Sequence, residues 1–298
     1  MRVLFISFAV VGVLFMSLFG VKQWALMMPS QRFDHPFVSL DQPQPITVIQ
    51  VHEPAEAKNI LSEIPQAYFW LDLRITADGK FLLLRPELTQ TTLTPEALGV
   101  EKWKGPQPSR YTEAELLILF PTAIRLQDFL VLFPETKMIL NILDNVDGVH
   151  TQLMAAVEGR LPEQRFLFQS SADIILKSLK DKKPMWLYGS SQSDLMKILT
   201  FESLGLEATS PFRGDVLIAP MQISGRAAFN ENVLTEILRR KKTIFLGPLI
   251  NNREVEQAAS FRPNGLIYSS LNLWRTTSAK VQSEAPTAVK IQKDPSDR

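Results

Sequence analysis

Short apolar runs alternate with amphipathic segments along most of this 298-residue chain, and this alternation constrains the fold more than any other feature. Each run has the length of a strand, and the segment that follows it has the hydrophobic period of a helix. Because parallel strands need a crossover connection, a strand–helix repeat predicts a parallel sheet. The runs interpreted as strands are Ile46–Val51, Tyr68–Leu73, Phe81–Leu84, Met138–Ile142, Phe166–Gln169, Met185–Tyr188, Val216–Ala219, Thr243–Leu246 and Gly265–Tyr268.

A closed (β/α)8 barrel is the arrangement we expect from this repeat. The region from 46 to 274 has about the length of one such barrel, roughly 230 residues. Nine strand candidates exceed the required eight, so one of them is expected to lie outside the barrel or to be misread. A doubly wound open sheet is the alternative. It usually has a glycine-rich turn after its first strand, and His52-Glu53-Pro54 is not such a turn.

The N-terminus carries the clearest local signal in the chain. Val3–Gly20 is apolar except for Ser7 and Ser17, and its length is close to that of a membrane-spanning helix. Arg2 precedes it, which favours an orientation with the N-terminus in the cytoplasm. No small-x-small cleavage site follows closely, so an uncleaved signal anchor is favoured over a cleaved signal peptide. The rest of the chain is then expected outside the cytoplasm, in the periplasm or at the cell surface.

The chain divides into four predicted regions. Residues 1–28 form the membrane anchor, and residues 29–45, with four prolines, form a linker. Residues 46–274 form the barrel. Residues 275–298 are rich in Ser, Thr, Lys and Pro and are expected to be disordered.

Composition excludes several classes of site and partner. The 32 Lys and Arg residues nearly balance 31 Asp and Glu residues, so there is no electrostatic case for binding nucleic acid. Cysteine is absent, which excludes disulfides and thiolate metal sites. Three histidines are too few for a His-rich metal centre. Protein partners and oligomeric state cannot be read from the sequence.

The segment from Trp70 to Glu87 reads WLDLRITADGKFLLLRPE and resembles the signature of glycerophosphodiester phosphodiesterases. In that family a Glu-x-Asp strand end is followed by an Asp-Gly turn and an apolar strand ending in His-Asp. Weaker similarities follow in the family's order at Arg125–Leu130, Leu140–Ile142, Gln169-Ser170 and Pro263–Tyr268. The resemblance implies a TIM barrel of the type found in phospholipase C-like phosphodiesterases.

The family's chemistry uses two histidines as general acid and base and a divalent cation, such as calcium or magnesium, held by three carboxylates. Two of these positions match here: His52 stands for the first histidine and Asp72 for the metal-binding aspartate. The remaining positions differ: Trp70 replaces the first metal-binding Glu, Arg85 the second His, Leu143 the fourth-strand Glu and Asn145 the following Lys, while Glu53-Pro54 replaces an Arg-Gly pair.

These departures imply a degenerate site. Asp72 alone is a poor ligand set for a hard cation, so we expect no bound metal and no cofactor. Arg85 stays protonated and cannot act as a general base. His52 and Asp72 remain the candidate catalytic residues. Arg74, Arg85 and Asn145 are the candidate ligand-binding residues, because arginine suits phosphate groups. The favoured interpretation is a structural ion pair between Asp72 and Arg85, and the alternative is that Arg74 and Arg85 bind an anion such as a phosphate group.

Two classes of function remain open. The first is a non-catalytic binding or scaffold protein, anchored outside the cytoplasmic membrane, with a phosphate-bearing ligand such as a glycerophosphodiester. The second is an active phosphodiesterase with an altered site that acts on glycerophosphodiesters or lipid headgroups. Retention of His52 and Asp72 favours the second class, and loss of two carboxylates and one histidine favours the first.

Overall fold

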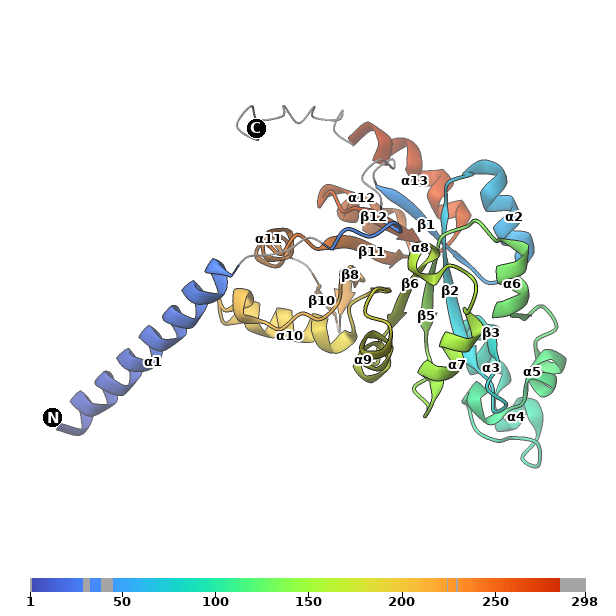
Figure 1. Ribbon diagram of the computed structural model, residues 1–298, viewed down its shortest axis with the longest axis horizontal. Helices are drawn as coiled ribbons and strands as arrows, with labels where there is room; N and C mark the ends of the chain where they lie inside the picture. Colours follow the sequence, from blue (N-terminus) through green and yellow to red (C-terminus); the bar gives the residue numbers. More distant parts are fainter. Residues whose placement is uncertain (1, 29–32, 39–44, 224, 229, 285–298) are drawn as a thin grey trace.

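Eight parallel strands form a nearly closed barrel surrounded by helices (Figure 1). The computed structural model describes residues 2–28, 33–38, 45–223, 225–228 and 230–284. The strands of the barrel, in their order around it, are β7 (Leu187–Tyr188), β6 (Phe166–Ser170), β5 (Met138–Ile142), β2 (Tyr68–Ile75), β1 (Ile46–Val51), β12 (Gly265–Tyr268), β11 (Thr243–Leu249) and β8 (Val216–Ala219). The expected barrel is therefore confirmed in place of the open sheet.

The seam between β7 and β8 is bridged by single hydrogen bonds rather than by a paired ladder. The Asp215 N–H donates to the Tyr188 carbonyl at 2.8 Å. The Ser190 hydroxyl donates to the Ile218 carbonyl at 2.8 Å and accepts from the Ile218 N–H at 3.0 Å. A Cβ on Gly214 would come within 2.9 Å of the Gly189 carbonyl oxygen, so glycine is required for this close approach.

The ninth strand candidate lies outside the barrel. Strand β3 (Phe81–Leu83) pairs antiparallel with β2 on one side and with the two-residue β4 (Ile124–Arg125) on the other. The cause is the tight Asp78-Gly79 turn, in which Gly79 has a φ of 77°. A tight hairpin reverses the chain, so the two strands that it joins are antiparallel. A further antiparallel pair, β9 (Gln222–Ile223) and β10 (Arg226–Ala227), follows β8.

Helices cover the outside of the barrel. They are α2 (Pro54–Glu63), α6 (Leu126–Leu132), α7 (Val149–Ala156), α8 (Pro162–Arg165), α9 (Asp173–Lys182), α10 (Gln192–Ser203), α11 (Glu231–Arg239), α12 (Asn252–Ser260) and α13 (Leu271–Glu284). Between β3 and β4 the chain forms a small insertion of α3 (Pro86–Thr92), α4 (Pro95–Leu98), η1 (Pro108–Arg110) and α5 (Glu113–Leu119), with its own apolar cluster around Tyr111 and Phe120.

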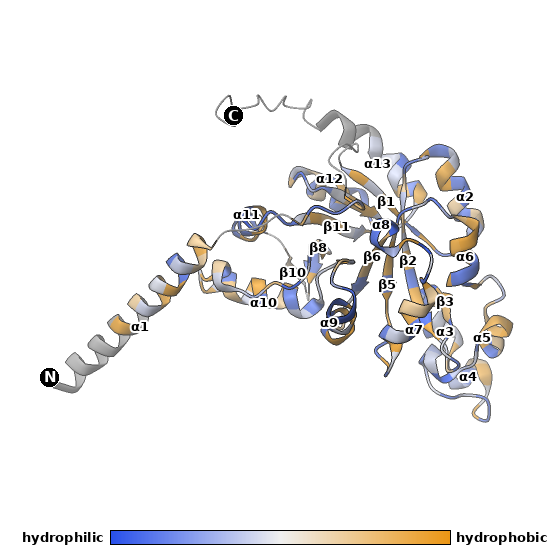
Figure 2. Ribbon diagram, viewed as in Figure 1, coloured by the Kyte–Doolittle hydropathy of each residue, from blue (hydrophilic) through white to orange (hydrophobic). Residues whose placement is uncertain are grey.

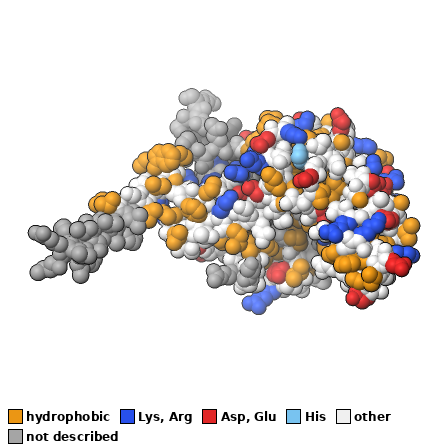
Figure 3. All heavy atoms as spheres, turned by 90° about the horizontal axis from the view of Figure 1, so that it is seen from below, with side chains coloured by type: hydrophobic (Ala, Val, Ile, Leu, Met, Phe, Trp, Pro, Cys, Tyr) orange, Lys and Arg blue, Asp and Glu red, His pale blue; other side chains and the backbone are white. Residues whose placement is uncertain are grey.

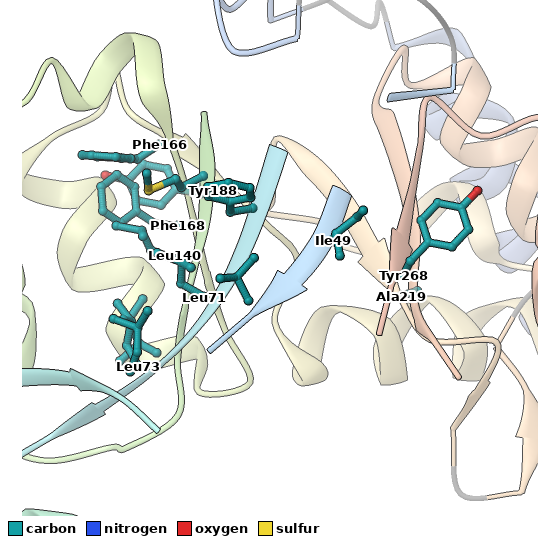
Figure 4. Packing of buried hydrophobic residues seen from close by; sticks show 14 of the residues in the cluster. Ile49, Leu71, Leu73, Leu140, Phe166, Phe168, Tyr188, Ala219 and Tyr268 are labelled. Atoms are coloured by element: carbon teal, nitrogen blue, oxygen red, sulfur yellow. The ribbon is translucent and has the colours of Figure 1, made fainter. Parts of the chain in front are cut away.

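Alternation along the strands produces two apolar layers, which make the strands mostly hydrophobic in Figure 2. One set of alternate residues, including Val48, Tyr68 and Trp70, fills the barrel interior. The other set faces the helices, and Figure 4 shows Ile49, Leu71 and Leu140 in this layer. Because Trp70, Asp72 and Arg74 alternate along β2, all three belong to the interior face.

Part of the predicted linker packs against the barrel. Phe37 is fully buried in the interior cluster, and its carbonyl accepts a hydrogen bond of 2.9 Å from the Tyr68 hydroxyl. Residues 29–32 and 39–44 of the linker lie outside the described residues. At the other end, α13 continues to Glu284, so residues 275–284 are helical rather than disordered as expected. Residues 285–298 lie outside the described part of the chain.

The N-terminal helix α1 (Arg2–Met27) projects away from the barrel in Figure 1. Near its end Lys22 forms an ion pair of 3.3 Å with Glu207 of the short helix η2 (Glu207–Thr209). The side chains of residues 2–12, 14 and 15, on which the expected membrane span depends, lie outside the described residues. Among the residues that are described, the structure has no helix long and apolar enough to cross a membrane.

Candidate functional site

Asp72 occupies the centre of the site, in the second half of β2. The residue is only 4% exposed, and three neutral side chains donate hydrogen bonds to its carboxylate. Oδ1 accepts from Trp70 Nε1 at 2.8 Å and from Asn141 Nδ2 at 2.7 Å. Oδ2 accepts from Gln50 Nε2 at 2.6 Å. Three charge-assisted hydrogen bonds thus stabilise the buried carboxylate, and among the described residues it forms no ion pair with a positively charged side chain.

Three adjacent strands bring these donors together. Gln50 follows Ile46 and Val48 on the interior face of β1, and Asn141 is the register partner of Asp72 on β5. The expected ion pair between Asp72 and Arg85 is not formed in the described part of the chain: Asp72 accepts from neutral donors on β1, β2 and β5, and Arg85 pairs with Glu56 instead.

Arg74 forms a second buried group with Asp144. Arg74 Nη1 donates to Asp144 Oδ1 at 2.8 Å, and the Ile75 N–H donates to Asp144 Oδ2 at 2.9 Å. The side chains of Arg74 and Asp144 are 18% and 7% exposed. Both carboxylate oxygens of Asp144 are therefore occupied by protein donors, and Arg74 is held in an ion pair.

His52 lies after β1, beside Glu56 and Arg85. The backbone N–H of His52 donates to Glu56 Oε2 at 2.9 Å, and Arg85 Nη2 forms an ion pair with Glu56 Oε1. Burial, and secondly the positive charge of Arg85, lower the pKa of His52 below its ordinary value of 6.5, although Asp72 and Glu56 act in the opposite direction. The half-buried imidazole is therefore neutral at pH 7, and its Nδ1 has no hydrogen-bond partner among the described residues.

Two cavities open on either side of the Asp72 group. The first, which we call the charged cavity, has a volume of about 330 Å³ and is lined by residues that include Gln50, His52, Glu56, Arg85 and Arg275. The second, the neutral cavity, has a volume of about 350 Å³. Its lining has no ionisable side chain and includes Trp70, Asn141, Leu143, Gln169, Ser190 and Pro248. Gln50 lines the charged cavity and Trp70 and Asn141 line the neutral one, so the Asp72 group forms the wall between them.

The structure brings the five predicted site residues to this end of the barrel, but only four of them belong to the groups described above. His52 follows β1, Asp72 and Arg74 lie in the second half of β2, and Arg85 follows β3. Asn145 is exposed and lines neither of the two cavities. Sequence reasoning missed the roles of Gln50, Glu56, Asn141 and Asp144. For Gln50 the signal was its position in β1, where it follows the inward-facing Ile46 and Val48 at alternate positions.

The fold has clear counterparts among solved structures. A protein named as a glycerophosphoryl diester phosphodiesterase from Silicibacter pomeroyi aligns with a TM-score of 0.59 at 14% identity, covering 80% of this chain and 95% of its own. A glycerophosphodiester phosphodiesterase from Parabacteroides distasonis aligns with a TM-score of 0.55 at 13% identity, covering 82% of this chain and 100% of its own. The fold is that of the glycerophosphodiester phosphodiesterases. A counterpart from Galdieria sulphuraria gives a TM-score of 0.56 at 14% identity, over 80% of this chain and all of the other.

The likeness to glycerophosphodiester phosphodiesterases is one of fold. The sequence matches no protein-family model and no curated protein. The resemblance stated from the Trp70–Glu87 segment is thus confirmed at the level of fold, across a low sequence identity.

The residues around Asp72 do not fit the divalent cation of the glycerophosphodiester phosphodiesterases. Trp70 presents an N–H group, and an indole nitrogen is a donor with no acceptor capacity. Leu143 faces the neutral cavity without a ligand atom. Among the described residues no group of three His, Cys, Asp or Glu side chains is placed to hold a metal ion.

Charges of both signs are interspersed over the barrel on the face shown in Figure 3. This distribution agrees with the near-balance of acidic and basic residues in the sequence. A nucleic-acid surface would instead gather lysine and arginine in one patch or stripe.

Proposed function

We propose that this protein is a non-catalytic barrel of the glycerophosphodiester phosphodiesterase type, which binds a phosphate-bearing ligand at the C-terminal ends of its strands. The observation that carries the proposal is the set of three neutral donors on Asp72. A carboxylate that accepts hydrogen bonds from Trp70, Asn141 and Gln50 has little remaining capacity to bind a cation.

Loss of the cation removes the main source of catalysis in such a site. A divalent metal polarises the phosphodiester and positions the nucleophile. Arg85 does not compensate, because it cannot accept a proton and is paired with Glu56. Arg74 is likewise paired, with Asp144. The remaining groups can hold and orient a ligand by hydrogen bonds.

An altered phosphodiesterase is the second candidate, and His52 is the observation that favours it. Its imidazole is neutral at pH 7 and lines a cavity at the mouth, so it could accept a proton from a nucleophile. Against this candidate, the described residues supply no second acid or base at the position of Arg85.

A hydrolysis assay separates the two candidates. The full chain is incubated with glycerophosphocholine in the presence of calcium, magnesium or EDTA, and released choline is measured. We expect no turnover above that of the buffer. Metal-dependent turnover that is abolished in Asp72→Ala would refute the non-catalytic assignment, and metal-independent turnover abolished in His52→Gln would establish the second candidate.

The proposed location is the outer side of a membrane, with the N-terminal segment as anchor. The proposal rests on the sequence, in which Arg2 precedes the apolar run Val3–Gly20. Reporter fusions after Pro45 test it. A reporter active only in the cytoplasm would overturn the extracytoplasmic location, and a mature protein lacking its N-terminus would overturn the uncleaved anchor.

A further inference from the structure

A third cavity lies outside the barrel, between the neighbouring helices α9 and α10 (Figure 1). Its volume is about 240 Å³, and its walls are α9, the start of α10, the end of β7 and the two residues Arg213 and Gly214 before β8. Tyr188 lines it and belongs to the apolar layer that faces the helices. Among the described residues this cavity shares no lining residue with the charged or the neutral cavity, so it is separate from the site around Asp72.

Asp194 contributes a buried acceptor atom to this cavity. The residue is 2% exposed and lies in the first turn of α10, where its Oδ2 accepts from the Ser191 N–H at 3.3 Å. Its other oxygen, Oδ1, is shielded from solvent and has no hydrogen-bond partner among the described residues. The capping interaction of α10 thus uses one carboxylate oxygen. Because a buried carboxylate without donors is costly, a ligand that donates to Oδ1 from the cavity would be held firmly.

The charged side chains of the lining balance in number. Three are acidic and three are basic: Asp173, Asp181, Asp194, Lys177, Lys180 and Arg213. Lys180 is already paired with Asp215 at 2.7 Å. Arg213 is paired with Asp173 at 3.4 Å. Lys177 is exposed on α9 and forms no ion pair within the described part of the chain. The same lining therefore contains an unpaired ammonium group and a carboxylate oxygen that lacks a donor.

The cavity also has an apolar part. Leu176, which is 6% exposed, and Tyr188 belong to the lining. Pockets for drug-sized ligands have volumes of roughly 300–1,000 Å³, so a cavity of about 240 Å³ suits a smaller molecule. The expected ligand is therefore small, with an apolar portion and a hydrogen-bond donor.

We propose that this cavity binds a free amino acid with a small aliphatic side chain. The ammonium group of the ligand donates to Asp194 Oδ1, its carboxylate pairs with Lys177, and its side chain packs against the apolar part of the lining. A simple amine would leave Lys177 without a partner, and a simple carboxylate would leave Asp194 without a donor. A zwitterion satisfies both groups and adds no net charge to a balanced lining. This inference is independent of the proposed phosphate-bearing ligand at the C-terminal ends of the strands.

Calorimetry on the full chain in non-ionic detergent tests the site with three probes. Valine carries both charged groups, isobutylamine lacks the carboxylate, and isovalerate lacks the ammonium group. Valine should bind more tightly than either of the others by about tenfold or more, since each of them lacks one charged hydrogen bond. No binding of valine at millimolar concentration, or an equal affinity for either of the other two probes, would overturn the site.

Matched variants assign the two charges. Asp194→Asn keeps an oxygen for the Ser191 N–H and should weaken valine binding by about tenfold or more. Lys177→Gln, on the exposed side of α9, should weaken the binding of valine but not that of isobutylamine, and it serves if Asp194→Asn does not fold. Asp128→Asn removes an equal charge from the exposed surface of α6 and should leave the affinity unchanged. Equal affinities for valine in these three variants would overturn the site.

Discussion

Trp70 donates its indole N–H to the carboxylate of Asp72, two residues further along the same strand, at 2.8 Å. In the glycerophosphodiester phosphodiesterases, the resemblance places a carboxylate at the position of Trp70 and a cation between the two acids. In this protein the indole N–H of Trp70 replaces one of those two carboxylates and donates a hydrogen bond to the other, Asp72. The substitution therefore removes a cation ligand and also satisfies the aspartate that the cation would have neutralised.

Asp72→Ala should destabilise the protein. The change removes three charge-assisted hydrogen bonds and leaves the Gln50, Trp70 and Asn141 donors without their acceptor. We expect the free energy of unfolding in urea to fall by about 3–5 kcal/mol, since each such bond contributes about 1.5–3 kcal/mol and the effects are not additive. The exposed control Asp147→Ala should change it by about 0.5 kcal/mol or less. Equal losses in the two variants would show that the Asp72 group is not a stabilising unit.

Restoring the carboxylates should create a metal-responsive protein. Trp70→Glu with Leu143→Glu places two acids beside Asp72, and mutual repulsion and lost packing should lower the melting temperature without metal. Calcium or magnesium should raise the melting temperature again, because bound metal adds about 2.7 kcal/mol to the free energy of unfolding at a metal concentration of 100 times Kd.

The matched control for this restoration is the double variant Trp70→Gln with Leu143→Gln, which has the same shape without the charges. Its melting temperature should not respond to either metal. If the Glu variant also fails to respond, Trp70 and Leu143 do not occupy the family's metal positions.

The barrel could be predicted from the sequence because its strands are continuous apolar runs. Buried parallel strands give that pattern whatever their neighbours are. The extra strand at Phe81 could have been placed outside the barrel as well, since the Asp78-Gly79 turn favours a hairpin and a hairpin is antiparallel. The turn at Asp78-Gly79 therefore shows which of the nine strand candidates lies outside the eight-stranded barrel.

The pairing within the site could not be predicted in the same way. Arg74 and Asp144 are 70 positions apart in the chain, and no local pattern shows that they meet. The sequence therefore predicts an anion-binding role for Arg74, whereas the structure places its guanidinium group in an ion pair with Asp144. The sequence also predicts Asp72 as the ion-pair partner of Arg85, but the partner in the structure is Glu56, in the first turn of α2.

Breaking the pair of Arg74 and Asp144 should be costly. Both side chains are largely buried, so Arg74→Met leaves an unpaired carboxylate in the interior and should destabilise by about 3–5 kcal/mol. Adding Asp144→Leu removes that carboxylate, so the double variant should lose less stability than the sum of the two single changes. Urea unfolding of the four proteins in this cycle gives the coupling energy. A coupling energy near zero would show that the two side chains do not stabilise each other.

Stability should depend on pH through His52. Burial and the charge of Arg85 lower its folded-state pKa below the 6.5 expected of an unfolded chain. As pH falls through 6.5, the unfolded chain therefore binds a proton before the folded protein does. The stabilisation from keeping His52 neutral is complete above pH 6.5 and is lost as pH falls toward the folded-state pKa. For one proton this loss cannot be steeper than about 1.4 kcal/mol per pH unit.

Urea unfolding at pH 7.5, 6.5 and 5.5 measures this loss, and variants assign it to a residue. Burial also lowers the pKa of His35, so the wild-type curve contains both contributions. His52→Gln should have a flatter pH dependence than the wild type, and His35→Gln should keep the share that belongs to His52. A wild-type slope that is unchanged in His52→Gln would mean that the ring is not desolvated in the folded protein. The same result would contradict the presence of a neutral imidazole facing the charged cavity, because it is burial beside Arg85 that keeps the ring unprotonated.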